Sequence, residues 1–311
     1  MGIIINKKIN GWIILDKQIG ISSRTAVTKI SRILKIKKVG HGGTLDPLAS
    51  GVLPIAVGEA TKVISFIQDK KKCYSFTIKW GETTETDDLE GAVLERSDVR
   101  PNIKQINSVI PSFIGQILQK PPIYSAIKVN GQRSYKLARK NIEVNHEFRK
   151  IEIYDLILKK IINRDKAEFE VKCGKGTYVR SLAKDLAEKL HTKGHVIKLR
   201  RLSVGNFEEK DTILIDFTKE IIHSPMIFNK ILPIETVLDD IPALVLNKTE
   251  ARQIKQGQKL ELNSLENIDH FLRKNPNYNK FEKIYAVENN DPIALITIYE
   301  GIVKPARIIN L

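Results

Sequence analysis

Apolar residues recur at helical spacing in four parts of the chain. Leucines 182, 186 and 190 predict a helix over residues 178–190, and a stripe crossed by Pro111 predicts one over 102–115. A short helix over 250–256, capped by Thr249, is expected before Gly257. Residues 23–35 form the clearest amphipathic helix, with Ser22 or Ser23 as its N-cap. Its apolar face consists of Val27, Ile30, Ile33 and Leu34.

Other segments have the residue patterns of β-strands, in which apolar and polar residues alternate or several apolar residues follow one another. Tyr74, Phe76 and Ile78 alternate with polar residues up to Trp80, and Gly81 ends the strand. From about Pro242 the short strands predict a small β-rich module, with 270–283 as an insertion loop. The remaining expected strands are 52–57, a returning strand at 92–94, two strands within 151–173 around residues 163–165, 195–202, 284–287, 293–298 and 306–309.

Composition then narrows the class of protein. The 311 residues carry 51 Lys and Arg against 36 Asp and Glu, a net charge of +15 that favours nucleic acid over an anionic membrane surface. Residues 1–72 alone hold 13 basic against 4 acidic residues. No apolar stretch could span a bilayer and no secretory signal is recognised, so we expect a cytoplasmic protein. Cys73 and Cys173 are expected to be reduced and structural.

One acid stands out among the candidate residues. Asp46 lies in the glycine-rich run Val39–Gly51, flanked by basic segments. Glycine backbone can approach a bulky partner closely, and the following apolar run would anchor such a loop on a buried element. The structural alternative is a turn in which Asp46 caps a helix or closes an Asx-turn before Pro47.

A second candidate is Arg180, which falls in the first turn of the helix predicted over 178–190. A cation there opposes the helix dipole, so Arg180 should have an acidic partner, either a surface carboxylate or Asp46.

The acidic run 82–90 would repel a polyanion and is expected to face away from one. Residues 123–150 mix cations with tyrosine, as an RNA-binding arm would, although a solvated helix and loop fit equally well.

Several separated motifs resemble those of the bacterial tRNA pseudouridine-55 synthases. Gly40–Pro54, which contains Asp46, is the most specific of these motifs, and Gly58–Lys62 follows it. Taken together, the motifs match in order across about residues 9–206. Gln18 departs from the family pattern, where proline is usual. The C-terminal part is similar to the small RNA-binding barrel of the PUA type. The supporting motifs are Lys72–Tyr74, Pro121–Lys128, Lys175–Arg180 and Leu199–Leu202.

The resemblance implies an α+β fold in two domains. Residues 1–238 would form a pseudouridine synthase catalytic domain around a long, mixed but mostly antiparallel sheet, with 123–150 as its RNA-binding arm. Residues 239–311 would form a PUA-like RNA-binding β-barrel.

The resemblance also implies a role for each matching residue. Asp46 would be the catalytic carboxylate, Arg180 its partner, and Tyr74 the ring that stacks on the target base. Tyr178 and Leu199 would line the pocket. His41 would fill the space left by the extruded base, and Lys62 would be a structural or RNA contact.

These expectations define an isomerase that converts uridine-55 of the tRNA T-loop to pseudouridine by base flipping. The reaction needs no energy source, and the sequence contains no nucleotide or metal motif, so we expect neither cofactor nor metal. An Asp paired with Arg would stay ionised even when desolvated. The expected partner is tRNA, with no membrane or protein partner, and the chain would act as a monomer. The alternatives are an RNA-binding or RNA-folding protein, or a synthase for another RNA.

Overall fold

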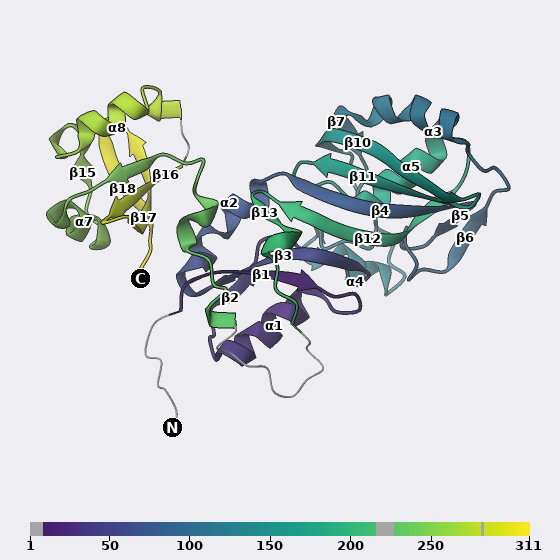
Figure 1. The fold of residues 1–311 in the computed structure, drawn as a ribbon, viewed down its shortest axis with the longest axis horizontal. Coiled ribbons are helices and arrows are strands. Elements are labelled where there is room, and N and C mark those ends of the chain that lie inside the picture. The colour runs from purple at the N-terminus through teal and green to yellow at the C-terminus, as the bar shows by residue number, and fades with distance from the viewer. Residues whose placement is uncertain (1–8, 216–226, 281–282) are drawn as a thin grey trace.

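The computed structural model describes residues 9–215, 227–280 and 283–311. A long nine-stranded sheet forms the body, and a five-stranded sheet forms a smaller module beside it (Figure 1). The main path of the large sheet has the order β1-β3-β12-β4-β11-β10-β7, with β2 paired to β3 and β13 paired to β12. Its strands are β1 (Gly11–Lys17), β2 (Val39–His41), β3 (Ala49–Val57), β4 (Lys72–Trp80), β7 (Gly115–Gln119), β10 (Arg149–Asn163), β11 (Lys166–Cys173), β12 (Gly194–Val204) and β13 (Phe207–Glu208).

The large sheet confirms the expected mixed, mostly antiparallel architecture. Only the pairing of β12 with β3 is parallel, and it extends over three residues from Leu199↔Ala49 to Arg201↔Gly51. All other strand pairs of this sheet are antiparallel. The short parallel contact brings the arginines of β12 beside the first residues of β3, immediately after the Asp46 loop.

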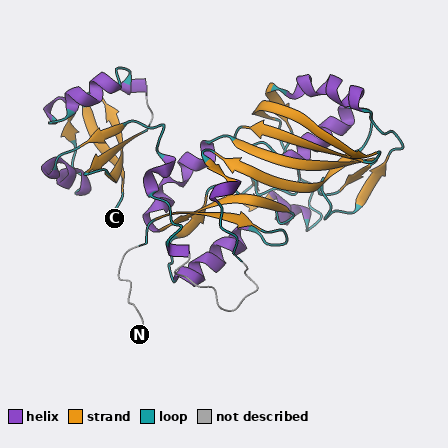
Figure 2. Ribbon diagram, viewed as in Figure 1, coloured by secondary structure: helices purple, strands orange, loops and turns teal. Residues whose placement is uncertain are grey.

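Helices flank the large sheet (Figure 2) and begin where the sequence provides caps. Ser22 Oγ accepts from the Thr25 amide at 3.0 Å at the start of α1, as predicted. α5 packs on β12 and β4 and buries Leu182 and Leu186. The helices of the body are α1 (Ser23–Leu34), α2 (Ile64–Asp69), α3 (Ile103–Val109), α4 (Ser134–Ala138) and α5 (Val179–Lys189).

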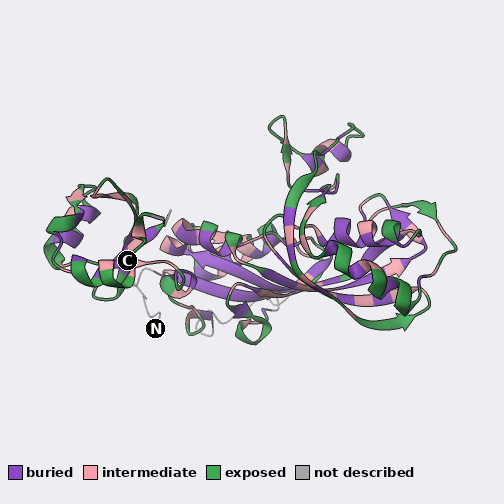
Figure 3. Cartoon of the chain, turned by 90° about the horizontal axis from the view of Figure 1, so that it is seen from above, coloured by how far each residue is buried: buried purple, intermediate pink, exposed green. Residues whose placement is uncertain are grey.

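Two small hairpins extend the body. The strand expected at 92–94 is β6 (Val93–Arg96), and it pairs with β5 (Glu82–Thr84) instead of returning along β4. β8 (Lys128–Val129), β9 (Gln132–Arg133) and α4 occupy the predicted arm, which projects from the sheet in Figure 3. The arm has its own buried contact, because Ser134 Oγ lies 2.9 Å from His146 Nε2.

The C-terminal module has its own core and confirms the predicted β-rich character. Its sheet has the order β14-β16-β17-β18-β15. Asn247 caps the first helix by accepting from the Glu250 amide, so the expected cap at Thr249 is wrong. The expected loop at 270–283 is also wrong in part, because α8 extends to Lys274. The elements are β14 (Ala243–Val245), α7 (Lys248–Lys255), β15 (Leu260–Glu261), α8 (Ile268–Lys274), β16 (Ile284–Glu288), β17 (Asp291–Tyr299) and β18 (Ile302–Ile308).

A separate apolar cluster joins the body to the module. Trp12 and Ile14 of β1 and Phe207 of β13 share this cluster with Ile309, which follows the last strand. Tyr285 of β16 packs against it. The module therefore contacts the body through buried apolar surface, and the boundary that we predict at residue 238 stays a prediction.

Candidate active site

Asp46 lies in the short loop between β2 and β3, and this loop is anchored on both sides of it. Ser23 Oγ donates to the Leu45 carbonyl at 3.0 Å and accepts from the Leu45 amide at 2.8 Å. On the other side the Pro47 carbonyl accepts from the Gly20 amide at 2.9 Å. Ser23 belongs to α1, so helix and loop position the acid together. The Asp46 side chain keeps 35% of its surface exposed, which leaves carboxylate surface open to a substrate.

Arg180 is the partner of Asp46. Its Nε donates to Asp46 Oδ2 at 2.9 Å, although the two residues are 134 positions apart in the sequence. The guanidinium side chain is only 4% exposed. It also donates to the Thr86 carbonyl at 2.7 Å and to the Tyr124 carbonyl at 2.9 Å. The fixed fork of the guanidinium thus ties the Asp46 loop, the acidic turn after β5 and the root of the arm to the start of α5.

The acidic run 82–90 contributes to the candidate site. It packs against Arg180, where the buried Asp88 places Oδ2 3.5 Å from Nη1. The expectation that the run faces away from a polyanion stays a prediction. A guanidinium has five N–H donors and one carboxylate cannot satisfy them, so the turn supplies further acceptors. Asp88, Thr86 and Tyr124 are the site residues that sequence reasoning missed. The concentration of acids after Gly81 was the available signal.

Tyr74 and Tyr178 both lie within reach of the Asp46 charge. Tyr74 sits in β4, and Tyr178 is the residue before α5. Burial raises the pKa of each phenol, and the negative charge of Asp46 raises it further. Gln119 fixes Tyr178 by accepting from its amide at 2.8 Å and donating to its carbonyl at 3.1 Å. Two aromatic rings therefore accompany the acid, as a site for a nucleobase requires.

His41 and Leu199 enter the site from neighbouring strands. His41 ends β2, and its pKa is lowered by burial and then by the charge of Arg201. Leu199 is buried in β12 between Ala49 of β3 and Phe76 of β4. The fold thus places both residues on strands next to the Asp46 loop, while their roles toward a substrate stay predictions.

Lys62 contacts none of these residues. Its ammonium lies 2.5 Å from Glu59 Oε2 and donates to the Ile308 carbonyl at the end of β18. Glu59 also binds Lys38 at 2.7 Å and accepts from the Asn310 amide at 2.8 Å. Lys62 is therefore part of the junction between body and module, and a contact with RNA stays a prediction.

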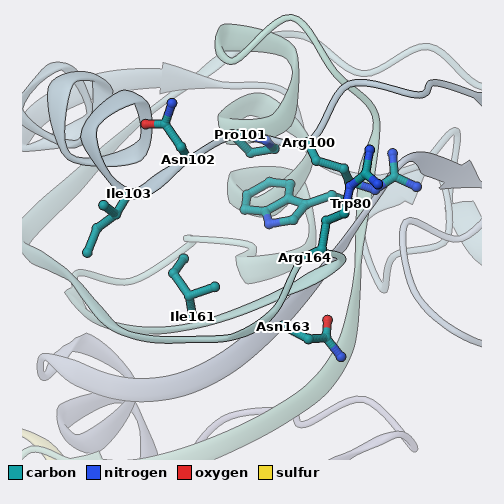
Figure 4. Close-up of a pocket in the computed structure, with 8 residues that line it drawn as sticks. All are labelled: Trp80, Arg100, Pro101, Asn102, Ile103, Ile161, Asn163 and Arg164. Atoms are coloured by element: carbon teal, nitrogen blue, oxygen red, sulfur yellow. The ribbon is translucent and has the colours of Figure 1, made fainter.

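A pocket of about 500 Å³ opens at the far end of β4 and shares no residue with the group around Asp46 (Figure 4). The buried Trp80 forms one wall, and the exposed Ile103 and Ile161 form others.

Across the part of the chain that the structure describes, no group of three His, Cys, Asp or Glu side chains is placed to hold a metal ion. None of the described helices is long and apolar enough to cross a membrane.

Comparison with known proteins identifies two family regions in the chain. Residues 31–179 match the TruB family pseudouridylate synthase N-terminal domain, and residues 180–239 match the tRNA pseudouridylate synthase B C-terminal domain. A tRNA pseudouridine synthase B from Rhodospirillum rubrum is 45% identical over 305 residues, which cover 97% of each chain. The enzyme of the same name from Ehrlichia canis is 42% identical over 304 residues, or 97% of this chain and 98% of its own.

Solved structures agree on the fold. A Cbf5-Nop10-Gar1 complex contains a chain that matches with a TM-score of 0.71 and 23% identity, covering 96% of this chain and 85% of that one. An H/ACA RNP bound to a substrate RNA containing 2'-deoxyuridine matches with a TM-score of 0.69 and 22% identity, over 97% and 85% of the two chains. At these identities the likeness concerns the fold alone.

Proposed function

The chain belongs to the TruB family of pseudouridylate synthases and is an isomerase of that type, and from this premise we propose that it converts uridine-55 in the T-loop of tRNA to pseudouridine. The observation that supports the proposal most strongly is the contact between Asp46 and Arg180. It joins the partly open carboxylate of the Gly40–Pro54 motif to the buried guanidinium of the Lys175–Arg180 motif.

The proposed reaction breaks the bond between uracil N1 and the ribose C1′, rotates the base and forms a bond from C5 to C1′. The proton on C5 leaves to solvent and N1 gains one, so no electrons are lost or gained overall. An anionic oxygen is needed to attack the sugar, to attack the ring or to remove a sugar proton. Asp46 is the residue we assign to this task, because its carboxylate is partly open and firmly positioned.

Arg180 acts on Asp46 in this proposal, and Asp88 acts on Arg180. The guanidinium fixes Asp46 Oδ2 through Nε, and the 35% exposure of the side chain leaves carboxylate surface open to a substrate. Asp88 and two backbone carbonyls hold the guanidinium in turn, so that it cannot swing out with a departing substrate. Such a supported pair keeps the reacting oxygen in one place, as a catalytic group requires.

The aromatic residues account for base flipping. A base inside a stacked loop must leave its stack to reach Asp46, at a cost of a few kcal/mol. We assign Tyr74 to stacking on the extruded uracil, Tyr178 and Leu199 to the walls around it, and His41 to the vacated space in the RNA. Each stacking contact contributes about 1–3 kcal/mol, which is enough to offset the extrusion.

The first experiment maps pseudouridine in RNA treated with the full-length protein. Tritium release from tRNA carrying [5-³H]uridine measures turnover, and sequencing of the product locates the modified position. We expect a single new pseudouridine at position 55, and no release from tRNA that has cytidine there. Release from other positions would indicate a synthase for another RNA, and tight binding without release would indicate an RNA-binding protein. A cytoplasmic, monomeric enzyme is part of the same proposal.

A further inference from the structure

Two adjacent arginines on β12 have opposite environments. Arg200 faces one side of the sheet, where its Nη atoms contact both oxygens of Asp16 at 2.9 and 3.0 Å and its Nε contacts Glu209. These are the contacts of an ordinary, partly exposed ion-pair network. Arg201 points to the other face and is only 1% exposed. The pair therefore offers two identical side chains on neighbouring residues, one of them a natural control for the other.

Arg201 is buried without a neutralising acid. Its Nε donates to the Val52 carbonyl at 2.7 Å and its Nη2 to the Gly43 carbonyl at 3.1 Å. Among the described residues no carboxylate forms an ion pair with it. A buried charge without a partner of opposite sign costs free energy that an apolar side chain of similar size would not. Stability alone is therefore a poor explanation for this arginine.

The register of the strands places Arg201 beneath the candidate site. It pairs with Gly51 of β3 on one side and with Tyr74 of β4 on the other. Cross-strand partners share a face of the sheet, so Arg201 and Tyr74 point the same way. Burial raises the pKa of the Tyr74 phenol, and the positive charge of Arg201 lowers it. Arg201 thus contacts β3 and the Asp46 loop, and it lies next to Tyr74 in the strand register.

Through Gly43 the same guanidinium reaches His41. The Gly43 amide lies 3.4 Å from His41 Nδ1 and donates to it, while the Gly43 carbonyl accepts from Arg201. Nδ1 can accept only when it carries no proton. Burial and the charge of Arg201 both lower the pKa of His41 and so favour this form.

We propose that Arg201 is a positioning residue for the isomerisation, a buried guanidinium that holds His41 and Gly43 where His41 fills the vacated space in the RNA, and Tyr74 where it stacks on the extruded uridine. It does not touch the base. It acts through its hydrogen bond to the Gly43 carbonyl and through its place beside Tyr74 in the sheet. The inference rests on the proposed function, since it assigns Arg201 to the same site and the same reaction.

The test compares Arg201→Met, Arg201→Lys and the matched control Arg200→Met. Methionine fills similar space without charge, and lysine restores the charge but cannot reach both carbonyls. We expect Arg201→Met to bind tRNA within about threefold of the wild type, because affinity depends mostly on phosphate contacts. Its single-turnover rate of tritium release should fall at least tenfold, with partial recovery in Arg201→Lys. Arg200→Met should stay within about threefold of the wild-type rate.

A second readout needs no activity. The His41 pKa, measured by NMR titration of the ring nitrogens without RNA, should rise in Arg201→Met and stay unchanged in Arg200→Met. The inference is overturned if the His41 pKa is unchanged in Arg201→Met. It is also overturned if folded Arg201→Met releases tritium at the same single-turnover rate as the wild type. A wild-type protein that releases no tritium from any tRNA overturns the proposed function instead, while the titration still reports on the contact. If Arg201→Met does not fold, Arg201→Gln, which also lacks the charge, is judged by the same two readouts.

Discussion

Asp46 and Glu59 are both carboxylates held by basic side chains, but the two sites are built in opposite ways. The Glu59 carboxylate is 13% exposed and is saturated by Lys38, Lys62 and the Asn310 amide. Asp46 is 35% exposed, and among the described residues its one basic ion-pair partner is Arg180. At the Asp46 site it is the cation that is saturated, by two carbonyls and Asp88.

The difference separates a structural ion pair from a reactive one. A carboxylate whose oxygens are all engaged can hold two parts of a protein together, as Glu59 does at the junction with the C-terminal module. A carboxylate that is to react must keep an oxygen available, and its position must then be fixed from elsewhere. In this protein the burial of Arg180 and the anchoring of Leu45 by Ser23 provide that fixation.

The largest effect is expected from Asp46→Asn. Removal of the reacting charge should lower the initial rate of tritium release by at least about 10³-fold, within the range of lost acid–base or nucleophilic groups. The melting temperature should change by less than about 3 °C, because the amide keeps the shape of the side chain. Asp165→Asn is the matched control, since Asp165 pairs with Arg100 at 2.5 Å on a surface turn. It should keep nearly full activity.

Arg180→Met should damage both activity and folding. It leaves the buried Asp88 without its partner, and loss of one member of a buried pair costs about 3–5 kcal/mol. For a chain of this size that corresponds to a fall of roughly 10 °C in melting temperature. Arg180→Lys keeps the charge but not the fork, and should fall between wild type and Arg180→Met in both measurements. Equal stability of all three proteins would contradict the contacts described for Asp88.

Replacement of Tyr74 tests the aromatic part of the site. Tyr74→Leu removes a ring whose stacking is worth about 1–3 kcal/mol, so the single-turnover rate should fall roughly 10- to 100-fold. Tyr74→Phe keeps the ring but loses the hydroxyl, and should fall by less. Binding of unmodified tRNA, measured by filter binding, should change little in either variant. If Tyr74→Leu reacts as fast as Tyr74→Phe, the stacking role assigned to the Tyr74 ring is contradicted.

The smallest effect on chemistry is expected from Glu59→Gln. Burial would raise the pKa of Glu59 above 4.5, but the Asn310 amide, Lys38 and Lys62 together lower it to about 2. Its ionised form therefore stabilises the folded protein fully above pH 4.5, and this contribution is lost as the pH falls toward 2. Glu59→Gln should reduce the unfolding free energy by about 1–3 kcal/mol at neutral pH. In denaturant titrations the difference from wild type should vanish near pH 2.

Sequence patterns predicted the parts of this fold that depend on local spacing. The cap at Ser22, the alternating strand up to Trp80 and the hairpin of β10 and β11 all follow from period and turn residues. The place of Arg180 in a first helical turn predicts an acidic partner, and the family resemblance implies that this partner is Asp46, as the structure shows. The errors arose where a choice depends on a partner. Asn247 caps α7 in place of Thr249 because Glu250 bonds back to its amide.

Contacts between segments that lie far apart in the sequence could not be predicted from the sequence. The acidic run 82–90 predicts only repulsion of a polyanion, and nothing in the sequence shows that Asp88 is buried against a guanidinium from α5. Lys62 sits in a motif that resembles a family signature, but its contacts with Glu59 and Ile308 become visible only when the end of the chain is in place. The burial of Arg201 likewise depends on two neighbouring strands, and nothing in its immediate sequence distinguishes it from Arg200.

The most direct test of the contrast between the two carboxylates is a single-turnover experiment on tRNA already bound by excess enzyme, so that binding and chemistry are measured separately. We predict that Asp46→Asn binds tRNA as wild type does and releases no tritium, while Glu59→Gln releases it at close to the wild-type rate once bound. Tritium release by Asp46→Asn within tenfold of wild type, or its loss in Glu59→Gln at full binding, would contradict the account.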